Sequence, residues 1–123
     1  MDRIIVKNLK IFAFHGVNPE EKQDGQNFFI DIICDCPLRK AGKSDDIEDT
    51  VSYAKIVKTA IAVFTAEKFD LIERAADKVA CAVLETYIPI ASVTVTVKKP
   101  EAPINAEFDY VAVEITRKRG DGK

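Results

Sequence analysis

Cysteine and histidine are scarce in this 123-residue sequence, and their scarcity excludes several kinds of site. The three cysteines are an odd number, with Cys34 and Cys36 two residues apart and Cys81 distant, so they form no disulfide framework. The single histidine, His15, is remote in sequence from all three, which excludes the usual zinc spacing. The cysteines are therefore predicted to be free thiols in a reducing cytoplasm, and no metal site is expected.

Long hydrophobic runs and an excess of basic residues are missing too. No apolar stretch approaches the 18 or so residues that cross a membrane, and the first ten residues do not resemble a secretory signal. With 18 Lys and Arg against 20 Asp and Glu, the formal net charge is −2, which argues against a nucleic-acid binder that relies on bulk positive charge. Glycine-rich phosphate loops and the Gly-x-Ser-x-Gly nucleophile motif are also absent.

Apolar residues, in contrast, are plentiful enough for one core. Hydrophobic residues make up 47% of the chain and charged residues 31%, which is typical of an ordinary folded domain and excludes overall disorder. The length predicts a single domain over residues 1–123, with a frayed tail from about residue 118.

Hydrophobic periodicity predicts the element order ββααββ. Alternating or β-rich stretches indicate four strands, at residues 3–14, 28–36, 91–99 and 108–115. Apolar residues at helical spacing indicate two helices, one beginning at Tyr53 and one near Asp70. The polar segment between the first two strands, HGVNPEEKQDGQ, is expected to be a loop.

This order predicts an α+β fold, with an antiparallel four-stranded sheet and both helices on one face. Such a sheet leaves its first and last strands unpaired on one side. Because long exposed edges invite pairing with another chain, the arrangement predicts oligomerisation through the sheet edges.

Lys99 breaks the pattern of the third strand. It continues the parity of Val93, Val95 and Val97, so its side chain points to the same side as the valines. Either its ammonium reaches water at the rim of the core, or it is held in a pocket where burial would make it a proton carrier. Since lysine is almost never fully buried, the residues alone favour the rim.

Four further residues are candidates, each with a structural alternative. Glu73 lies three residues after Asp70, which favours a capping box, although a carboxylate also matches a planar pair of N–H donors as in guanine or a pterin. Tyr53 lies on an apolar stripe, which favours packing in the core or at an interface, although a phenol can also move a proton. Glu21 lies in the predicted loop, where most acids are solvated. His15, at a strand end, is more often structural than a base.

Four stretches of the sequence together resemble the dihydroneopterin aldolase family of folate biosynthesis. They are FHGVNPEEKQDGQNFFID, SDDIEDTVSYAKI, FDLIERAADKVA and VKKPEAPINAEFDYVAVEI, and they fall on the predicted elements. The resemblance extends from about Asp2 to Arg117. It implies the tunnelling fold, in which four subunits close a barrel through their sheet edges and two such rings stack as a homo-octamer.

The resemblance also implies an activity. The family is a lyase that cleaves 7,8-dihydroneopterin into 6-hydroxymethyl-7,8-dihydropterin and glycolaldehyde, without a metal, a cofactor or a Schiff base. Carried over by motif, the catalytic roles fall on Lys99 and Tyr53. Substrate-binding roles fall on Glu21, Tyr53, Glu73 and the backbone of Ile72. The resemblance thus reverses the residue-based interpretation of Lys99 and Tyr53, and it implies that the tyrosine comes from a neighbouring subunit.

The match has departures and leaves alternatives open. Many family members have Pro-Gly-His where this chain has Asn105, Ala106 and Glu107, which bears on substrate fit more than on the reaction class. The alternatives are a C2′ epimerase acting on the same substrate and a non-catalytic oligomer that binds pterins or purines. The expected partners are a small pterin and further copies of the chain, with no nucleic acid and no membrane.

Overall fold

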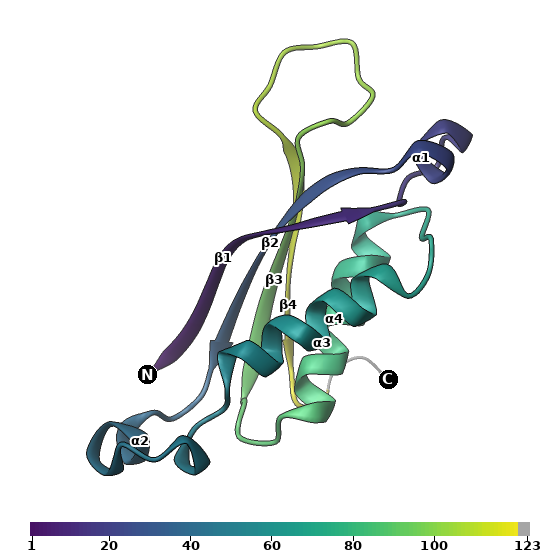
Figure 1. Cartoon of the computed structure of the whole chain (residues 1–123). Coiled ribbons are helices and arrows are strands. Elements are labelled where there is room, and N and C mark those ends of the chain that lie inside the picture. Colours follow the sequence, from purple (N-terminus) through teal and green to yellow (C-terminus); the bar gives the residue numbers. More distant parts are fainter. Residues whose placement is uncertain (121–123) are drawn as a thin grey trace.

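The computed structural model describes residues 1–120 as a four-stranded sheet with helices on one face, an α+β fold (Figure 1). The strands are β1 (Arg3–Ala13), β2 (Gln26–Asp35), β3 (Ser92–Lys99) and β4 (Val111–Lys118). The helices are α1 (Pro19–Asp24), α2 (Arg39–Ser44), the 3-10 helix η1 (Ile47–Asp49), α3 (Tyr53–Thr65) and α4 (Ile72–Thr86).

The sheet has the predicted topology. Its strand order is β1-β2-β3-β4, and every neighbouring pair is antiparallel. Helices α3 and α4 lie side by side across one face, as Figure 1 shows. The predicted antiparallel sheet with both long helices on one face is therefore confirmed. Strands β1 and β4 each have one unpaired side within the chain, which is the edge arrangement expected from the sequence.

The core forms where the sheet meets the two long helices. Alternate residues of β2 and β3 pair across the strands and are fully buried, because the pleat directs every second side chain to the same face. The helices cover this face with their predicted apolar stripes, although Ile61 of α3 stays partly exposed. The buried residues of these elements include Ile30, Ile32, Val95, Val97, Ile56, Phe64, Val79 and Val83.

Three short helices replace segments that the sequence predicts to be loops. The segment between β1 and β2 contains α1, which begins at Pro19 with Glu20 and Glu21 in its first turn. Proline is well suited to the first helical position and acids to the first turn, so Pro19 starts this helix rather than breaking one. Helix α2 and η1 form in the turn-rich segment before α3. All three are too short to show helical periodicity.

The last strand lies three residues later than predicted. It begins at Val111 rather than Phe108, because Lys99 pairs with Val111 and residues 100–110 form the loop that projects beyond the sheet at the top of Figure 1. The exposed residues Asn105 to Glu107 lie in this loop.

The predicted frayed tail is also wrong in its first residues. Lys118 ends β4, and the Arg119 guanidinium donates hydrogen bonds to the backbone oxygens of Leu84, Tyr87, Ile88 and Ile90. Arg119 therefore binds one carbonyl in the last turn of α4, that of Leu84, and three in the segment that follows the helix. Residues 121–123 of the predicted tail lie outside the described residues.

The cysteines are free and differ in burial. Cys34 and Cys36 are buried on the apolar face of the sheet, as their position in the predicted strand indicates, whereas Cys81 on α4 is half-buried. Burial raises the pKa of the Cys34 thiol to about 12, so the thiolate is absent at neutral pH. Among residues 1–120, no helix has both the length and the apolar character to cross a membrane.

Candidate functional site

Lys99 and Glu21 form an ion pair at one end of the sheet. Lys99 is the last residue of β3, and Glu21 lies on α1, which is linked to the start of β2 by Gly25. Their Nζ and Oε2 atoms are 2.6 Å apart, and the side chains are only 13% and 7% exposed. The ammonium therefore meets a buried carboxylate rather than bulk water. The rim position favoured by the residues alone is wrong, because the ammonium pairs with Glu21 of α1 and the Lys99 side chain is largely buried.

Glu21 is held by three donors instead of being solvated. Besides Lys99, its carboxylate accepts hydrogen bonds from Gln26 Nε2 at 3.0 Å and from the Asn18 backbone N–H at 3.3 Å. Burial alone would raise the pKa of Glu21, but the bonds from Lys99, Gln26 and Asn18 outweigh it and hold that pKa below its usual value. The carboxylate is therefore ionised at neutral pH, and the interpretation of Glu21 as a solvated loop acid is wrong.

Two neighbours of this pair carry no strong signal in the sequence. The Oε1 atom of Gln26 is buried and has no hydrogen-bond partner among residues 1–120, while its amide nitrogen binds Glu21. Gly16 has a φ of 148°, and a Cβ on it would lie 2.1 Å from Glu21 Oε1. Only glycine leaves room for the carboxylate there. A glycine two residues after the predicted end of the first strand is the one feature that the sequence offers as a clue.

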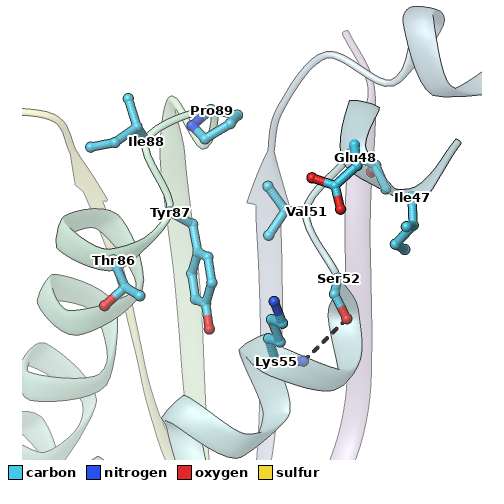
Figure 2. Close-up of a pocket in the computed structure, with 10 residues that line it drawn as sticks. Ile47, Glu48, Val51, Ser52, Lys55, Thr86, Tyr87, Ile88 and Pro89 are labelled. Carbon is cyan, nitrogen blue, oxygen red and sulfur yellow. Dashed lines mark hydrogen bonds between the residues drawn. The ribbon is translucent and has the colours of Figure 1, made fainter.

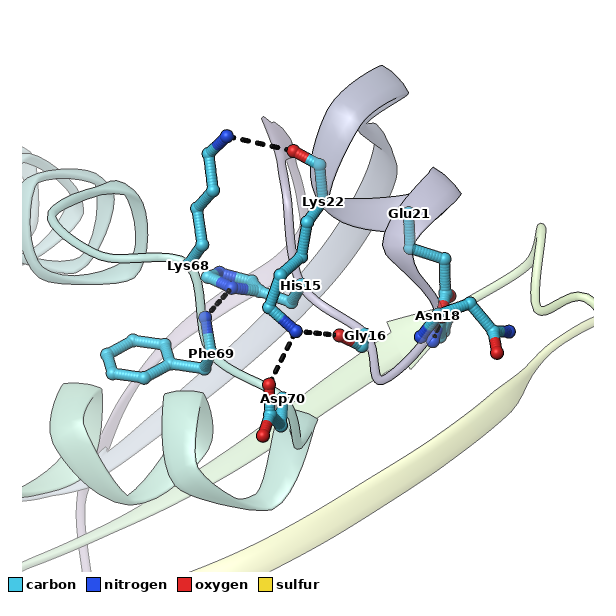
Figure 3. A network of polar contacts seen from close by, with 9 residues as sticks. His15, Gly16, Asn18, Glu21, Lys22, Lys68, Phe69 and Asp70 are labelled. Carbon is cyan, nitrogen blue, oxygen red and sulfur yellow. Dashed lines mark hydrogen bonds and ion pairs between the residues drawn. The ribbon is translucent and has the colours of Figure 1, made fainter.

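His15 is a structural residue, as predicted. Its side chain is fully buried among Phe28, Phe64 and Phe69. Its Nδ1 accepts from the Phe69 N–H at 3.0 Å (Figure 3). Its Nε2 therefore carries the proton and donates to the Phe64 carbonyl at 2.8 Å. Burial lowers the pKa of His15, with contributions from the nearby Lys99 and Lys22 charges, so the ring is neutral at neutral pH.

Acidification is expected to destabilise the protein through His15. Because the folded-state pKa is lowered, the unfolded chain binds more protons than the native state below the usual histidine range. The contribution of His15 to the free energy of unfolding is complete above the usual histidine pKa range. It is lost as the pH falls, and the free energy of unfolding then changes by up to about 1.4 kcal/mol per pH unit. Thermal unfolding between pH 7.5 and 5.5 measures it. A His15→Gln variant should show a flatter profile, and an unchanged slope would exclude this histidine as the cause.

Glu73 and Ile72 lie at the start of α4. The predicted capping box is wrong, because the N-cap position is Leu71 and no side chain caps this end. Asp70 instead forms an ion pair with Lys22 of α1. Glu73 is the second residue of the helix and is exposed, while Ile72 is buried. The Glu73 carboxylate is therefore open to a ligand, and the Asp70–Lys22 pair places it at the same end of the molecule as Glu21.

Tyr53 lies at the opposite end. It is the first residue of α3 and is 70% exposed, so the predicted packing role is wrong for the single chain. Phe64, whose carbonyl contacts His15, follows eleven residues later, which is roughly 16 Å along a helix. Within one chain, Tyr53 is therefore separated from the end of the sheet that carries Lys99 and Glu21.

An open cavity of about 470 Å³ lies beside Tyr53, between the start of α3 and the end of α4 (Figure 2). Ser52 and Lys55 line it at the start of α3, and Tyr87 and Ile88 line it from the segment after α4. Its volume is in the range of ligand sites. Its charged lining residues are one acid, Glu48, and one lysine, Lys55. In residues 1–120, no group of three or more histidines, cysteines or acids is placed to hold a metal ion.

Comparison with known proteins shows which family shares this sequence. The family model for dihydroneopterin aldolase matches residues 4–116. The chain belongs to the dihydroneopterin aldolase family. It is 45% identical over 120 residues to the dihydroneopterin aldolase of Methylorubrum extorquens, covering 98% of this chain and 92% of the relative. It is 37% identical to that of Bacillus subtilis, covering 97% and 99%.

The solved structures agree with this assignment. The crystal structure of Escherichia coli dihydroneopterin aldolase in complex with neopterin is 33% identical, with a TM-score of 0.87 over 95% of this chain and 99% of that one. A dihydroneopterin aldolase family structure from Vibrio cholerae is 29% identical, with a TM-score of 0.89 and coverage of 97% and 98%. The match thus includes the whole sheet, both long helices and the segments that carry Lys99, Glu21 and Glu73.

Proposed function

We propose that this protein cleaves 7,8-dihydroneopterin by a retro-aldol reaction, releasing glycolaldehyde and leaving 6-hydroxymethyl-7,8-dihydropterin. The observation that carries the proposal is the buried Lys99–Glu21 pair, which supplies a proton-transfer group at one end of the sheet in a chain of this family. The exposed Glu73 carboxylate at the start of α4 supplies a second, recognising group at the same end.

Glu73 binds the aminopyrimidine edge of the pterin in this proposal. A carboxylate accepts two parallel N–H bonds from such an edge. The backbone of Ile72 adds a contact to the ring, and Glu21 meets the hydroxylated side chain. Glu73 lies in the first turn of α4, where the positive end of the helix dipole suits an acidic side chain.

Lys99 moves the protons of the reaction, with Tyr53 and an ordered water. It takes the proton of the 2′-hydroxyl, the C2′–O bond becomes a carbonyl, and the C1′–C2′ bond breaks. The bonding electrons move into the dihydropterin ring system as an enamine, and a proton added at C1′ completes the product. The ion pair with Glu21 fixes the position of the Lys99 Nζ atom for this role. The ammonium form also stabilises negative charge that develops on the substrate.

Tyr53 reaches this site from a neighbouring chain in the proposed assembly. Its exposure, its position at the far end of α3 and the unpaired edges of β1 and β4 support a site built between two copies. We propose a homo-octamer of two tetrameric rings, which sedimentation velocity would distinguish from a single ring. We also place the protein in the cytoplasm, since three free cysteines suit a reducing compartment.

Substitution of Glu73 by glutamine is expected to weaken pterin binding without unfolding α4. Glutamine offers one donor and one acceptor where the carboxylate offers two acceptors, so affinity should fall by about 1.5–3 kcal/mol, the scale of a hydrogen bond to a charged group. Calorimetric titration with neopterin measures the loss. Glu85→Gln, on the exposed side of the same helix, is the matched control. Equal affinity in the Glu73 and Glu85 variants would remove Glu73 from the binding site.

Product analysis tests the reaction itself. Dihydroneopterin is incubated with the protein in excess chelator, and glycolaldehyde and the pterin products are quantified. Net glycolaldehyde supports the lyase and, in the presence of chelator, a mechanism without a metal. A C2′ epimerised pterin without net glycolaldehyde would support the epimerase. Pterin binding without any turnover would support a non-catalytic binding oligomer.

A further inference from the structure

Two loops meet beside the Lys99–Glu21 pair: the segment after β1, with His15 and Gly16, and the segment before α4, with Phe69 and Asp70. They are joined by a buried set of hydrogen bonds and by an outer set nearer the surface. In the buried set, the Phe69 N–H donates to His15 Nδ1, and the Gly16 N–H donates to the Phe69 carbonyl at 2.9 Å. In the outer set, Lys22 Nζ donates both to the Gly16 carbonyl and to Asp70 Oδ1, the latter at 2.5 Å. Figure 3 shows Lys22 extending between the two loops. We call these two contacts of Lys22 the clasp.

The clasp joins two segments that each lead directly to a residue of the proposed site. Lys22 follows Glu21 on α1, and Asp70 precedes Glu73 by three residues at the start of α4. We propose that Lys22 is a positioning residue that sets the separation between Glu73, which would hold the pterin ring, and the Lys99–Glu21 pair, which would act on its side chain. This inference rests on the proposed function.

The clasp contributes little to folding. The Lys22 side chain is 29% exposed and the Asp70 side chain 71% exposed, and an ion pair of this kind adds between 0 and about 1 kcal/mol of stability. The fold of this region depends instead on the buried His15 and its three phenylalanines. Loss of the clasp should therefore loosen the relative position of two segments while the protein stays folded.

The separation between Glu73 and the Lys99–Glu21 pair affects the affinity of a ligand only if the ligand contacts both. Neopterin carries a trihydroxypropyl chain and spans from the ring-binding carboxylate to Lys99. Guanine offers a similar aminopyrimidine edge but has no side chain, so it contacts the Glu73 region alone. The clasp should matter for the first ligand and not for the second. A change in their relative affinity separates a positioning role from a general loss of structure.

Calorimetric titration of Lys22→Met with both ligands tests this inference. Neopterin should bind about fivefold more weakly than to the unmodified protein, as expected for the loss of about 1 kcal/mol, while guanine affinity stays within about twofold. Lys22→Arg keeps the charge and the donors and should restore neopterin binding. Lys40→Met, which breaks the exposed Lys40–Asp49 pair on α2, is the control and should change neither ligand.

Other outcomes would contradict the proposed positioning role of Lys22. Unchanged neopterin affinity in Lys22→Met, or an equal loss for both ligands, would show that Lys22 does not set the spacing. Amide hydrogen exchange gives a reading without any ligand: Gly16 and Phe69 should exchange faster in Lys22→Met than in Lys40→Met. Failure of the unmodified protein to bind either ligand would contradict the proposed function. The exchange rates would then decide the clasp alone, with equal rates overturning it.

Discussion

Replacement of Lys99 by methionine is expected to lower kcat by at least about 10²-fold, the scale of one positioned acid–base group. Methionine keeps much of the length and volume of the side chain and removes only the amine. Steady-state turnover of dihydroneopterin measures the effect. Retention of kcat would remove Lys99 from the chemistry.

The same substitution should also destabilise the protein, because it leaves the Glu21 carboxylate buried without its charge partner. Breaking a buried pair in this way costs about 3–5 kcal/mol. The double variant Lys99→Met with Glu21→Gln removes both charges, so most of the lost stability should return while kcat stays low. Denaturant unfolding and turnover of the two variants separate the roles. Recovery of turnover together with stability would show that the lysine acts only on the fold.

Co-refolding of two inactive variants is expected to restore activity. A Lys99→Met chain keeps Tyr53, and a Tyr53→Phe chain keeps Lys99. If each site takes Tyr53 from a neighbour, some interfaces in the mixed oligomer contain both residues. Activity should then rise well above the average of the two parents, which must first be shown to be folded and oligomeric.

A second mixture provides the matched control. Lys99→Met and Glu73→Gln alter residues at the same end of the chain, so no interface between them regains a complete site, and activity should stay at the parental average. Activity that stays at the average in both mixtures would mean that Tyr53 and Lys99 act within one chain or that one of them has no catalytic role.

The strands and long helices were predictable because their side chains repeat with the period of the backbone. Val93, Val95 and Val97 are buried as their alternation predicts, and the same parity places Lys99 on their side of the sheet. Short helices lack this signal. Helix α1 has only six residues, so the sequence around Pro19 predicts a loop instead.

The roles of single polar residues were less predictable, because they depend on partners distant in sequence. The capping box expected at Asp70 does not form, since Lys22, 48 residues away, takes the carboxylate. Glu21 is buried where it pairs with Lys99, a residue far from it in the sequence. Tyr53 lies on the apolar stripe of α3, which predicts burial, yet its side chain is exposed in the single chain.

The three cysteines differ in burial, so the rates at which their thiols react with a reagent report how the protein opens. A thiol reagent should modify half-buried Cys81 first, while Cys34, fully enclosed and with its thiol pKa raised to about 12, reacts only when the sheet separates from the helices. Pulsed alkylation followed by mass spectrometry would therefore time local and global opening separately, without any introduced label. The alkylation rates of Cys81 and Cys34, measured before and after assembly, would show how much of their protection comes from the fold of the single chain.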